Sequence, residues 1–129
     1  MSDLIKSMSA ASSGMAAQAA RLRLNTENIA NADTPGYRRK LVTFEQAFGQ
    51  DQKGQVKTGR MMLDKSDLTE VYDPSHPLAG TDGTYESSNV NMIVEIADAR
   101  EAQRSYEANL KMFDQARQMT SSLLDLLRR

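Results

Sequence analysis

The sequence predicts a mainly α-helical fold in which two long terminal helices flank a small β-containing insert. Two long amphipathic segments lie at the ends of the 129-residue chain, at about 3–31 and 91–128. Between them, residues 32–90 hold all three Pro and six of the seven Gly, so turns replace helix there. Helices of these lengths would measure roughly 40 and 55 Å, as is typical of coiled coils. We therefore expect three segments: 1–31, 32–90 and 91–129.

The N-terminal segment carries apolar residues at intervals of seven, which predicts a heptad stripe along one helix face. Small Ala residues beside the stripe would let another helix approach closely, while Gly14 costs about 1 kcal/mol relative to Ala in a helix interior. Such a helix is marginal alone and needs packing partners. The stripe consists of Met1, Met8, Met15, Leu22 and Ile29, with Leu4 on the same face.

The C-terminal segment is predicted to begin at Asn89 or Asn91, which are both good N-cap residues. Glu95 lies in the first turns, where the helix dipole favours negative charge. Three positions of the predicted stripe are polar, so a pure leucine zipper is not expected. The stripe runs through Met92, Ile96, Ala99, Gln103, Tyr106, Leu110, Phe113, Arg117, Thr120, Leu124 and Leu127.

Two arrangements of these helices fit the pattern. They could pair with each other as an antiparallel hairpin, or both could seek partners in neighbouring subunits. Leu123 and Leu126 lie beside Leu124 and Leu127 and cover more than one helix face. A two-helix pair would leave part of that surface exposed, which favours the second arrangement at the C-terminus.

The middle segment begins with a strong turn signal at Asp33–Tyr37. Pro35 sets φ at one corner, and Gly36 can take the positive φ that a type II turn requires at the next. Residues 41–44, 55–62 and 68–72 are plausible strands.

Residue types and spacing exclude most catalytic chemistry. The chain has no Cys and a single His, so it lacks ligands for a transition-metal site, and no cofactor is expected. His76 sits between Pro74 and Pro77, which favours a structural turn over an acid–base site. The basic triplet 38–40 precedes no phosphate-binding loop and is interpreted as solvated charge. A net charge of −1 gives no reason to expect nucleic acid, and neither an enzyme nor a small-molecule substrate is predicted.

Membrane insertion is not expected either. The uncharged run 7–20 is too short and too polar to cross a bilayer, which needs about 20 apolar residues. The N-terminus also lacks the continuous apolar core of a cleaved signal peptide. A membrane-surface role for the first helix stays open, although Lys6, Arg21 and Arg23 form only a sparse basic face.

Three amides recur at a spacing of three, at Asn25, Asn28 and Asn31. They could mark a fraying helix end, with Asn31 as a cap. They could equally be paired amides that fix the register against another chain, as a buried Asn does in coiled coils. The residues alone leave both interpretations open.

The segment Leu24-Asn25-x-x-Asn28-Ile-Ala-Asn31-x-x-Thr34-x-Gly36-Tyr37-x-Arg39 resembles the N-terminal signature of bacterial flagellar axial proteins, the family of rod and hook subunits. Residues 72–77, 89–91 and 99–109 are similar to segments of its proximal-rod members. This resemblance implies a structural subunit of the basal-body rod that spans the periplasm. It also implies export through the flagellar type III apparatus without a cleaved signal. Such a subunit would stack helically with its own copies and with other proximal and distal rod subunits and the rotor-ring adaptor, and would transmit torque to the distal rod and hook.

The resemblance also implies roles for particular residues. The terminal helices would form a coiled-coil-like inner domain, and the middle segment would form an outer part. The rival interpretations are a self-contained helical-hairpin adaptor and a sister rod subunit. The implied assembly motif and hinge is Asn25, Asn28, Asn31, Thr34, Pro35, Gly36, Tyr37 and Arg39; the intersubunit faces are Leu4, Met8, Met15, Leu22, Ile29, Ile96, Tyr106, Asn109, Leu110, Phe113, Leu124 and Leu127; the outer loop is Tyr72, Pro74, His76 and Pro77.

Overall fold

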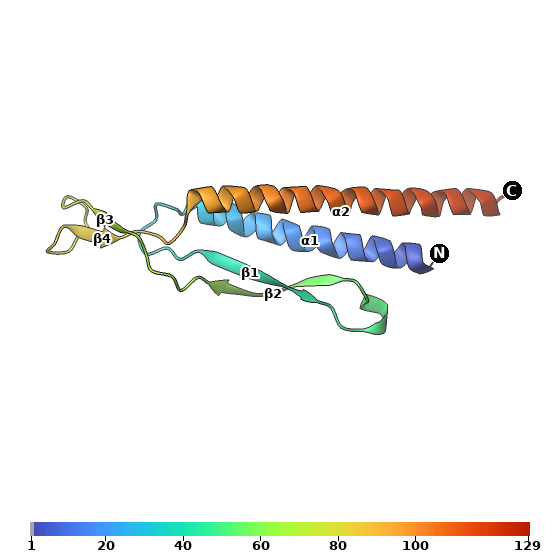
Figure 1. Ribbon diagram of the computed structural model, residues 1–129, viewed down its shortest axis with the longest axis horizontal. Coiled ribbons are helices and arrows are strands. Elements are labelled where there is room, and N and C mark those ends of the chain that lie inside the picture. Colours follow the sequence, from blue (N-terminus) through green and yellow to red (C-terminus); the bar gives the residue numbers. More distant parts are fainter. Residues whose placement is uncertain (1) are drawn as a thin grey trace.

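The computed structural model describes residues 2–129, so Met1, the first position of the predicted heptad stripe, lies outside the described residues. Two long helices flank a small β-containing insert, which confirms the predicted fold class (Figure 1). The elements are α1 (Ser2–Ala30), β1 (Lys40–Gln46), a short 3₁₀ helix (Gln50–Gln52), β2 (Val56–Leu63), β3 (Glu70–Tyr72), β4 (Thr84–Glu86) and α2 (Met92–Leu127).

The two helices lie side by side and antiparallel, with both chain termini at the same end (Figure 1). Along α1, Gly14 approaches Asn109, Arg21 bonds to Asp98, and Asn28 bonds to Glu95. As α1 advances from Gly14 to Asn28, its contact residues on α2 come earlier in the sequence, from Asn109 back to Glu95. The helices therefore do pair within the chain, and α2 runs on past the start of α1.

Small side chains build the seam between the helices. Among the described residues, the buried apolar ones are Ala11, Ala17, Leu24, Ala102 and Ala116, so the backbones approach closely. A Cβ on Gly14 would lie 2.9 Å from Nδ2 of Asn109, closer than real contacts allow. Gly14, which we expect to weaken the helix, thus makes room for the facing helix.

The seam on α2 departs from the predicted stripe. Its buried and half-buried positions alternate by four and three, through Glu95, Ala99, Ala102, Tyr106, Asn109, Phe113, Ala116 and Thr120. Other predicted members, such as Ile96, Leu110 and Leu124, are exposed. These predicted stripe residues therefore do not form the contact with α1. A search for large apolar residues leaves out the Ala, Asn and Glu side chains that face α1.

Helix α2 begins after Asn91, whose side chain accepts hydrogen bonds from the backbone N–H groups of Ile93 (3.1 Å) and Val94 (3.3 Å). Of the two predicted N-caps, the structure therefore selects Asn91.

The insert forms two separate two-stranded sheets. The hairpin β1–β2 lies along α1, where the backbone N–H of Val56 donates to Ser13 Oγ (3.0 Å) (Figure 1). The pair β3–β4 lies beyond the end of the helix pair that is opposite the two chain termini. The three predicted strands are confirmed with shifted bounds, while β4 was missed because Thr84–Glu86 is short and directly follows turn residues.

Within residues 2–129, neither helix combines the length and the apolarity needed to cross a bilayer.

Candidate functional site

A tight turn follows α1 and redirects the chain toward β1. The backbone N–H of Tyr37 donates to the Thr34 carbonyl (3.1 Å), and Gly36 has φ 73° between them. This is the turn that the Pro-Gly pair predicted. Asn31 closes the helix end, since its Nδ2 donates to the Glu27 carbonyl (2.9 Å) and its Oδ1 accepts from the Thr34 hydroxyl (3.1 Å).

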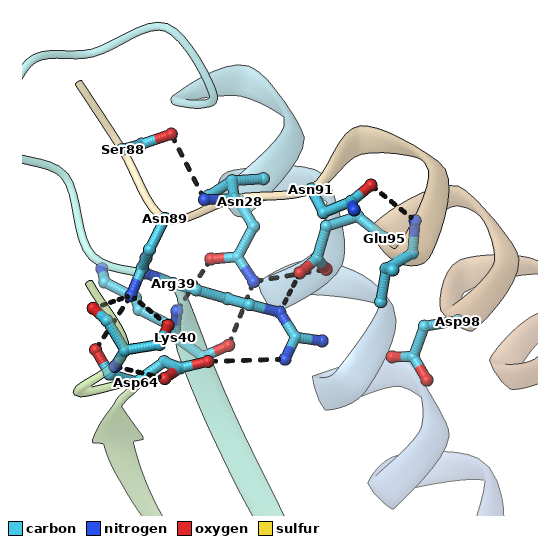
Figure 2. A network of polar contacts seen from close by, with 12 residues as sticks. Asn28, Arg39, Lys40, Asp64, Ser88, Asn89, Asn91, Glu95 and Asp98 are labelled. Carbon is cyan, nitrogen blue, oxygen red and sulfur yellow. Dashed lines mark hydrogen bonds and ion pairs between the residues drawn. The ribbon is translucent and has the colours of Figure 1, made fainter. Parts of the chain in front are cut away.

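Asn28 is fully buried and joins four parts of the chain (Figure 2). Its Oδ1 accepts hydrogen bonds from the Tyr37 hydroxyl (2.9 Å) and the Lys40 backbone N–H (2.9 Å). Its Nδ2 donates to the Lys40 carbonyl (3.0 Å) and, more weakly, to Glu95 Oε2 (3.4 Å). Burial raises the pKa of Tyr37, which keeps its hydroxyl protonated as a donor. One amide therefore ties α1, the turn, β1 and α2 together.

A buried ion pair lies beside this amide. The Glu95 side chain is fully buried, and its Oε1 pairs with Arg39 Nε. Arg39 also lies 3.9 Å from Asp64 (Nη1 to Oδ2). The prediction that the basic triplet is solvated is wrong. Arg39 pairs with Glu95, and Lys40 pairs with Glu27, which raises the pKa of Lys40. Arg38 is half-buried and its Nη1 donates to the carbonyls of Asp64 (3.3 Å) and Ser66 (3.0 Å).

The segment between β4 and α2 is hydrogen-bonded to the same part of the chain. Asn89 Oδ1 accepts from the Arg39 backbone N–H (2.7 Å), and its Nδ2 donates to the carbonyls of Asp64 (3.1 Å) and Ser66 (3.2 Å). Ser88 donates its hydroxyl to the Ala32 carbonyl. We call the whole network of Asn28, Tyr37, Arg39, Asn89 and Glu95 the joint.

A second bridge joins the helices about two turns before Asn28 on α1 and about one turn after Glu95 on α2. Arg21 donates to both carboxylate oxygens of Asp98, and its Nε lies 3.1 Å from Oδ2. This Arg21 contact holds the pKa of Asp98 below its ordinary value. The Asn25 side chain is buried, yet its Nδ2 meets hydrogen-bond geometry with no other described residue.

The predicted intersubunit residues divide into two sets. Tyr106, Asn109 and Phe113 are half-buried at the seam with α1, and the predicted residues of α1 are half-buried as well. Those left exposed are Ile96 (41%), Leu110 (41%), Leu124 (42%) and Leu127 (79%).

Residues 73–83, which connect β3 to β4 and include the predicted outer-loop residues Pro74, His76 and Pro77, form a series of turns. Asp73 Oδ1 accepts from the Ser75 N–H (3.1 Å) and hydroxyl (2.6 Å), which lowers the pKa of Asp73. His76 stacks on Tyr85 with the ring centroids 3.9 Å apart. Its Nδ1 accepts from the Leu78 N–H (3.1 Å), so the imidazole is occupied by the loop. Tyr72, Pro74 and Pro77 are exposed.

Sequence reasoning missed two members of the joint. Glu95 was interpreted as a charge that complements the helix dipole, and Asn89 as a possible cap. The available signal for Glu95 was its position, since it falls on the same helix face as Ala99, Ala102 and Tyr106.

Three of the five joint residues, Asn28, Tyr37 and Arg39, belong to the segment that resembles the flagellar signature, and comparison with known proteins agrees with that resemblance. The family described as "Flagella basal body rod protein" matches residues 8–38, and "Flagellar basal body rod FlgEFG protein C-terminal" matches residues 81–126. The flagellar basal-body rod protein FlgC of Agrobacterium fabrum is 44% identical over 92% of this chain and 91% of its own length. The chain belongs to the FlgC family of flagellar basal-body rod proteins.

Other FlgC proteins agree over nearly the full length. The FlgC of Salmonella typhimurium is 32% identical over 90% of this chain and 92% of its own, and that of Bacillus subtilis is 29% identical over 93% and 95%. FlgC membership also decides against a sister rod subunit. The family is one of structural rod proteins, so the chain is a structural component of the basal body and not an enzyme.

Proposed function

We propose that this FlgC chain builds the proximal rod by stacking helically on other copies of itself and on other rod proteins. The exposed area of the single chain is the observation that carries the proposal. The chain exposes 9152 Å² for a mass of 14.3 kDa, whereas a compact monomer of that mass exposes about 6,800 Å². The excess of roughly 2,300 Å² is of the size that obligate assemblies bury.

The exposed apolar side chains indicate where neighbours pack. On α2 they follow the outer face from Leu110 and continue through the C-terminal turns, where residues 121–129 are all exposed. A monomer gains nothing from this surface, while burial against neighbours would stabilise a rod by about 25 cal/mol per Å². The large exposed apolar residues of this region are Leu110, Met112, Met119, Leu123, Leu124, Leu126 and Leu127.

The joint gives such a subunit its stiffness. Torque that enters through the helix faces must pass to the hairpin and the β3–β4 tip, and the joint connects all of them through directional hydrogen bonds. Since Asn28 and Glu95 are fully buried, the angle between these parts cannot change without leaving polar groups unpaired. The rod would thereby carry torque from the rotor to the distal rod and hook.

Family membership supports the proposal for the remaining partners and for the location. The chain would be exported by the flagellar type III apparatus without a cleaved signal and would assemble in the periplasm. Its neighbours would be the rotor-ring adaptor and the proximal and distal rod subunits.

Cross-linking in assembled rods tests the proposal. Because the chain has no Cys, Leu110→Cys introduces a single thiol on the exposed face. A bifunctional thiol reagent is expected to join this residue to a neighbouring subunit that carries the same thiol. Ala102→Cys is the matched control on the same helix, since this residue is buried against α1 and should not cross-link. Absence of cross-links from both Leu110→Cys and Leu124→Cys, with the chain present in rods, would refute the proposal.

The intramolecular pairing of α1 and α2 favours a second candidate, a self-contained helical-hairpin adaptor. An adaptor would be monodisperse, with fully formed helices at every concentration. A rod subunit would associate as its concentration rises, with termini whose amides exchange rapidly in the monomer and become protected in the rod. Light scattering with circular dichroism and hydrogen exchange separates these two candidates.

A further inference from the structure

The outer face of the first turns of α2 is apolar and has no partner within the chain. Ile93 is 79% exposed and Ile96 is 41% exposed. They border a shallow depression that is also lined by Ala97, Arg100, Glu101 and Arg104. Neither of these two arginines has an ion-pair partner among the described residues, whereas nearby Glu101 lies 3.5 Å from Arg21 of its own chain. The face thus combines an apolar centre with two free guanidinium groups.

A groove of complementary character lies at the β3–β4 tip. Pro35, Leu78 and Tyr85 form its apolar part, and Glu70 and Glu86 also line it. These two glutamates are directly opposite each other in the β3–β4 ladder. Like charges in that position destabilise a strand pair. Residues 66–86 contain no Lys or Arg, and neither glutamate has an ion-pair partner among the described residues.

The two surfaces match in spacing as well as in charge. Side chains four apart on a helix have Cβ atoms about 5–6 Å apart, and directly opposed strand residues about 4.5–5.5 Å apart. Arg100 and Arg104 can therefore each face one of the two carboxylates while Ile93 and Ile96 cover the apolar part of the groove. Within one chain they do not meet, because the tip extends beyond the start of α2 while both arginines lie further along the helix (Figure 1).

We propose that the Ile93–Arg104 face of one copy docks into the β3–β4 groove of a second copy of this chain. Both halves of the contact are present on every chain, and they are different surfaces. When each copy uses its two surfaces on two different neighbours, the contact is heterologous, and its repetition builds a helical stack if the rotation between copies does not close into a ring. This inference rests on the proposed function and names one interface of that stack.

A charge swap tests the contact in rods assembled from two co-expressed chains, one carrying Ile93→Cys and the other Leu78→Cys. Oxidation is expected to yield the mixed disulfide. Reversing the groove with Glu70→Lys and Glu86→Lys is expected to lower its yield about ten-fold, the factor for about 1.4 kcal/mol. Adding Arg100→Glu and Arg104→Glu should restore the yield. Asp67→Lys, a charge change in the same tip outside the groove, should leave the yield unchanged.

The outcomes separate this contact from the proposed function. If the reversal has no effect, or if the swap does not restore the yield while Leu110→Cys still cross-links, the second copy is not the occupant and another partner fills the groove. Loss of the Leu110→Cys cross-links in otherwise unaltered chains would instead count against rod assembly itself.

Stability of the isolated chain gives an independent readout. Glu70→Lys places opposite charges across β3–β4, so it is expected to raise the thermal midpoint of the monomer while it weakens the contact between copies. A purely structural role for these glutamates predicts changes of the same sign in both measurements. If Glu70→Lys lowers the midpoint and the cross-link together, the assignment is wrong. Glu70→Gln with Glu86→Gln serves as a milder variant if the reversal prevents folding.

Discussion

The joint is held by contacts within one chain, whereas the free end of the helix pair, residues 121–129, is exposed. At the joint, the polar atoms of the Asn28 and Glu95 side chains all bond to partners in the same chain, and both side chains are completely buried. At the free end, residues 121–129 are all exposed and include four leucines. The difference follows from the kind of interaction. Hydrogen bonds are directional and fix an angle within one subunit, whereas apolar burial is non-directional and is gained against whichever surface is offered.

Breaking the ion pair at the joint should have the largest effect on the monomer. Arg39→Met leaves the Glu95 carboxylate buried without its counter-charge, so a loss of about 3–5 kcal/mol in the free energy of unfolding is expected. Urea denaturation measures this loss. Arg104→Met, at an exposed and unpaired arginine, should change stability by less than about 0.5 kcal/mol. The double variant Arg39→Met with Glu95→Leu should recover much of the loss, because no buried charge is left.

Removing the buried amide should come next. Asn28→Ala leaves the Lys40 N–H and carbonyl and the Tyr37 hydroxyl without their partner, for an expected loss of about 2–4 kcal/mol. The same denaturation experiment applies. Asn31→Ala removes only two bonds at a helix end and should cost about 1 kcal/mol. Equal losses for the two variants would contradict a central role for Asn28.

The second helix bridge should contribute less and should depend on pH. The folded pKa of Asp98 is lowered by Arg21, so its contribution is present above the unfolded pKa of about 3.9 and is lost as the pH falls through the folded value. Asp98→Asn should therefore cost about 1 kcal/mol at pH 7. At a pH below the folded pKa the difference between variant and parent should shrink. A difference that stays constant after the folded Asp98 carboxyl has been protonated would show that the lost contribution is not electrostatic.

Changing the free end should leave the monomer almost unaltered. Leu124→Ser alters a side chain that is 42% exposed, so the free energy of unfolding should change by less than about 0.5 kcal/mol. Leu24→Ser, at a buried leucine of α1, should lose about 2–5 kcal/mol. In rods we expect Leu124→Ser to have a large effect despite its small effect on the monomer. It should strongly reduce assembly, measured by motility and by recovery of the subunit in basal bodies. Normal assembly of this variant would show that the free end is not an interface.

Several features of the fold could be predicted from local patterns. The heptad spacing of Met8, Met15, Leu22 and Ile29 was enough to predict α1, and Pro35-Gly36 was enough to predict its closing turn. These signals are local, because helix periodicity and turn dihedrals depend on residues only a few positions apart. The contact surface between the helices was harder to predict, since a sequence pattern favours Ile96 and Leu110 over Ala102 and Asn109 as contact residues.

The sequence by itself determined the two terminal helices, the turn-rich insert between them and, through the motif from Leu24 to Arg39, the flagellar rod family. Only the tertiary structure decided that Asn28 serves its own chain, that Glu95 is buried against Arg39, and that the hairpin lies back along α1. Those outcomes depend on groups up to 67 positions apart in the chain. Whether a polar side chain is exposed or fully paired is set by what folds over it, and that is a property of the packed molecule rather than of any local pattern.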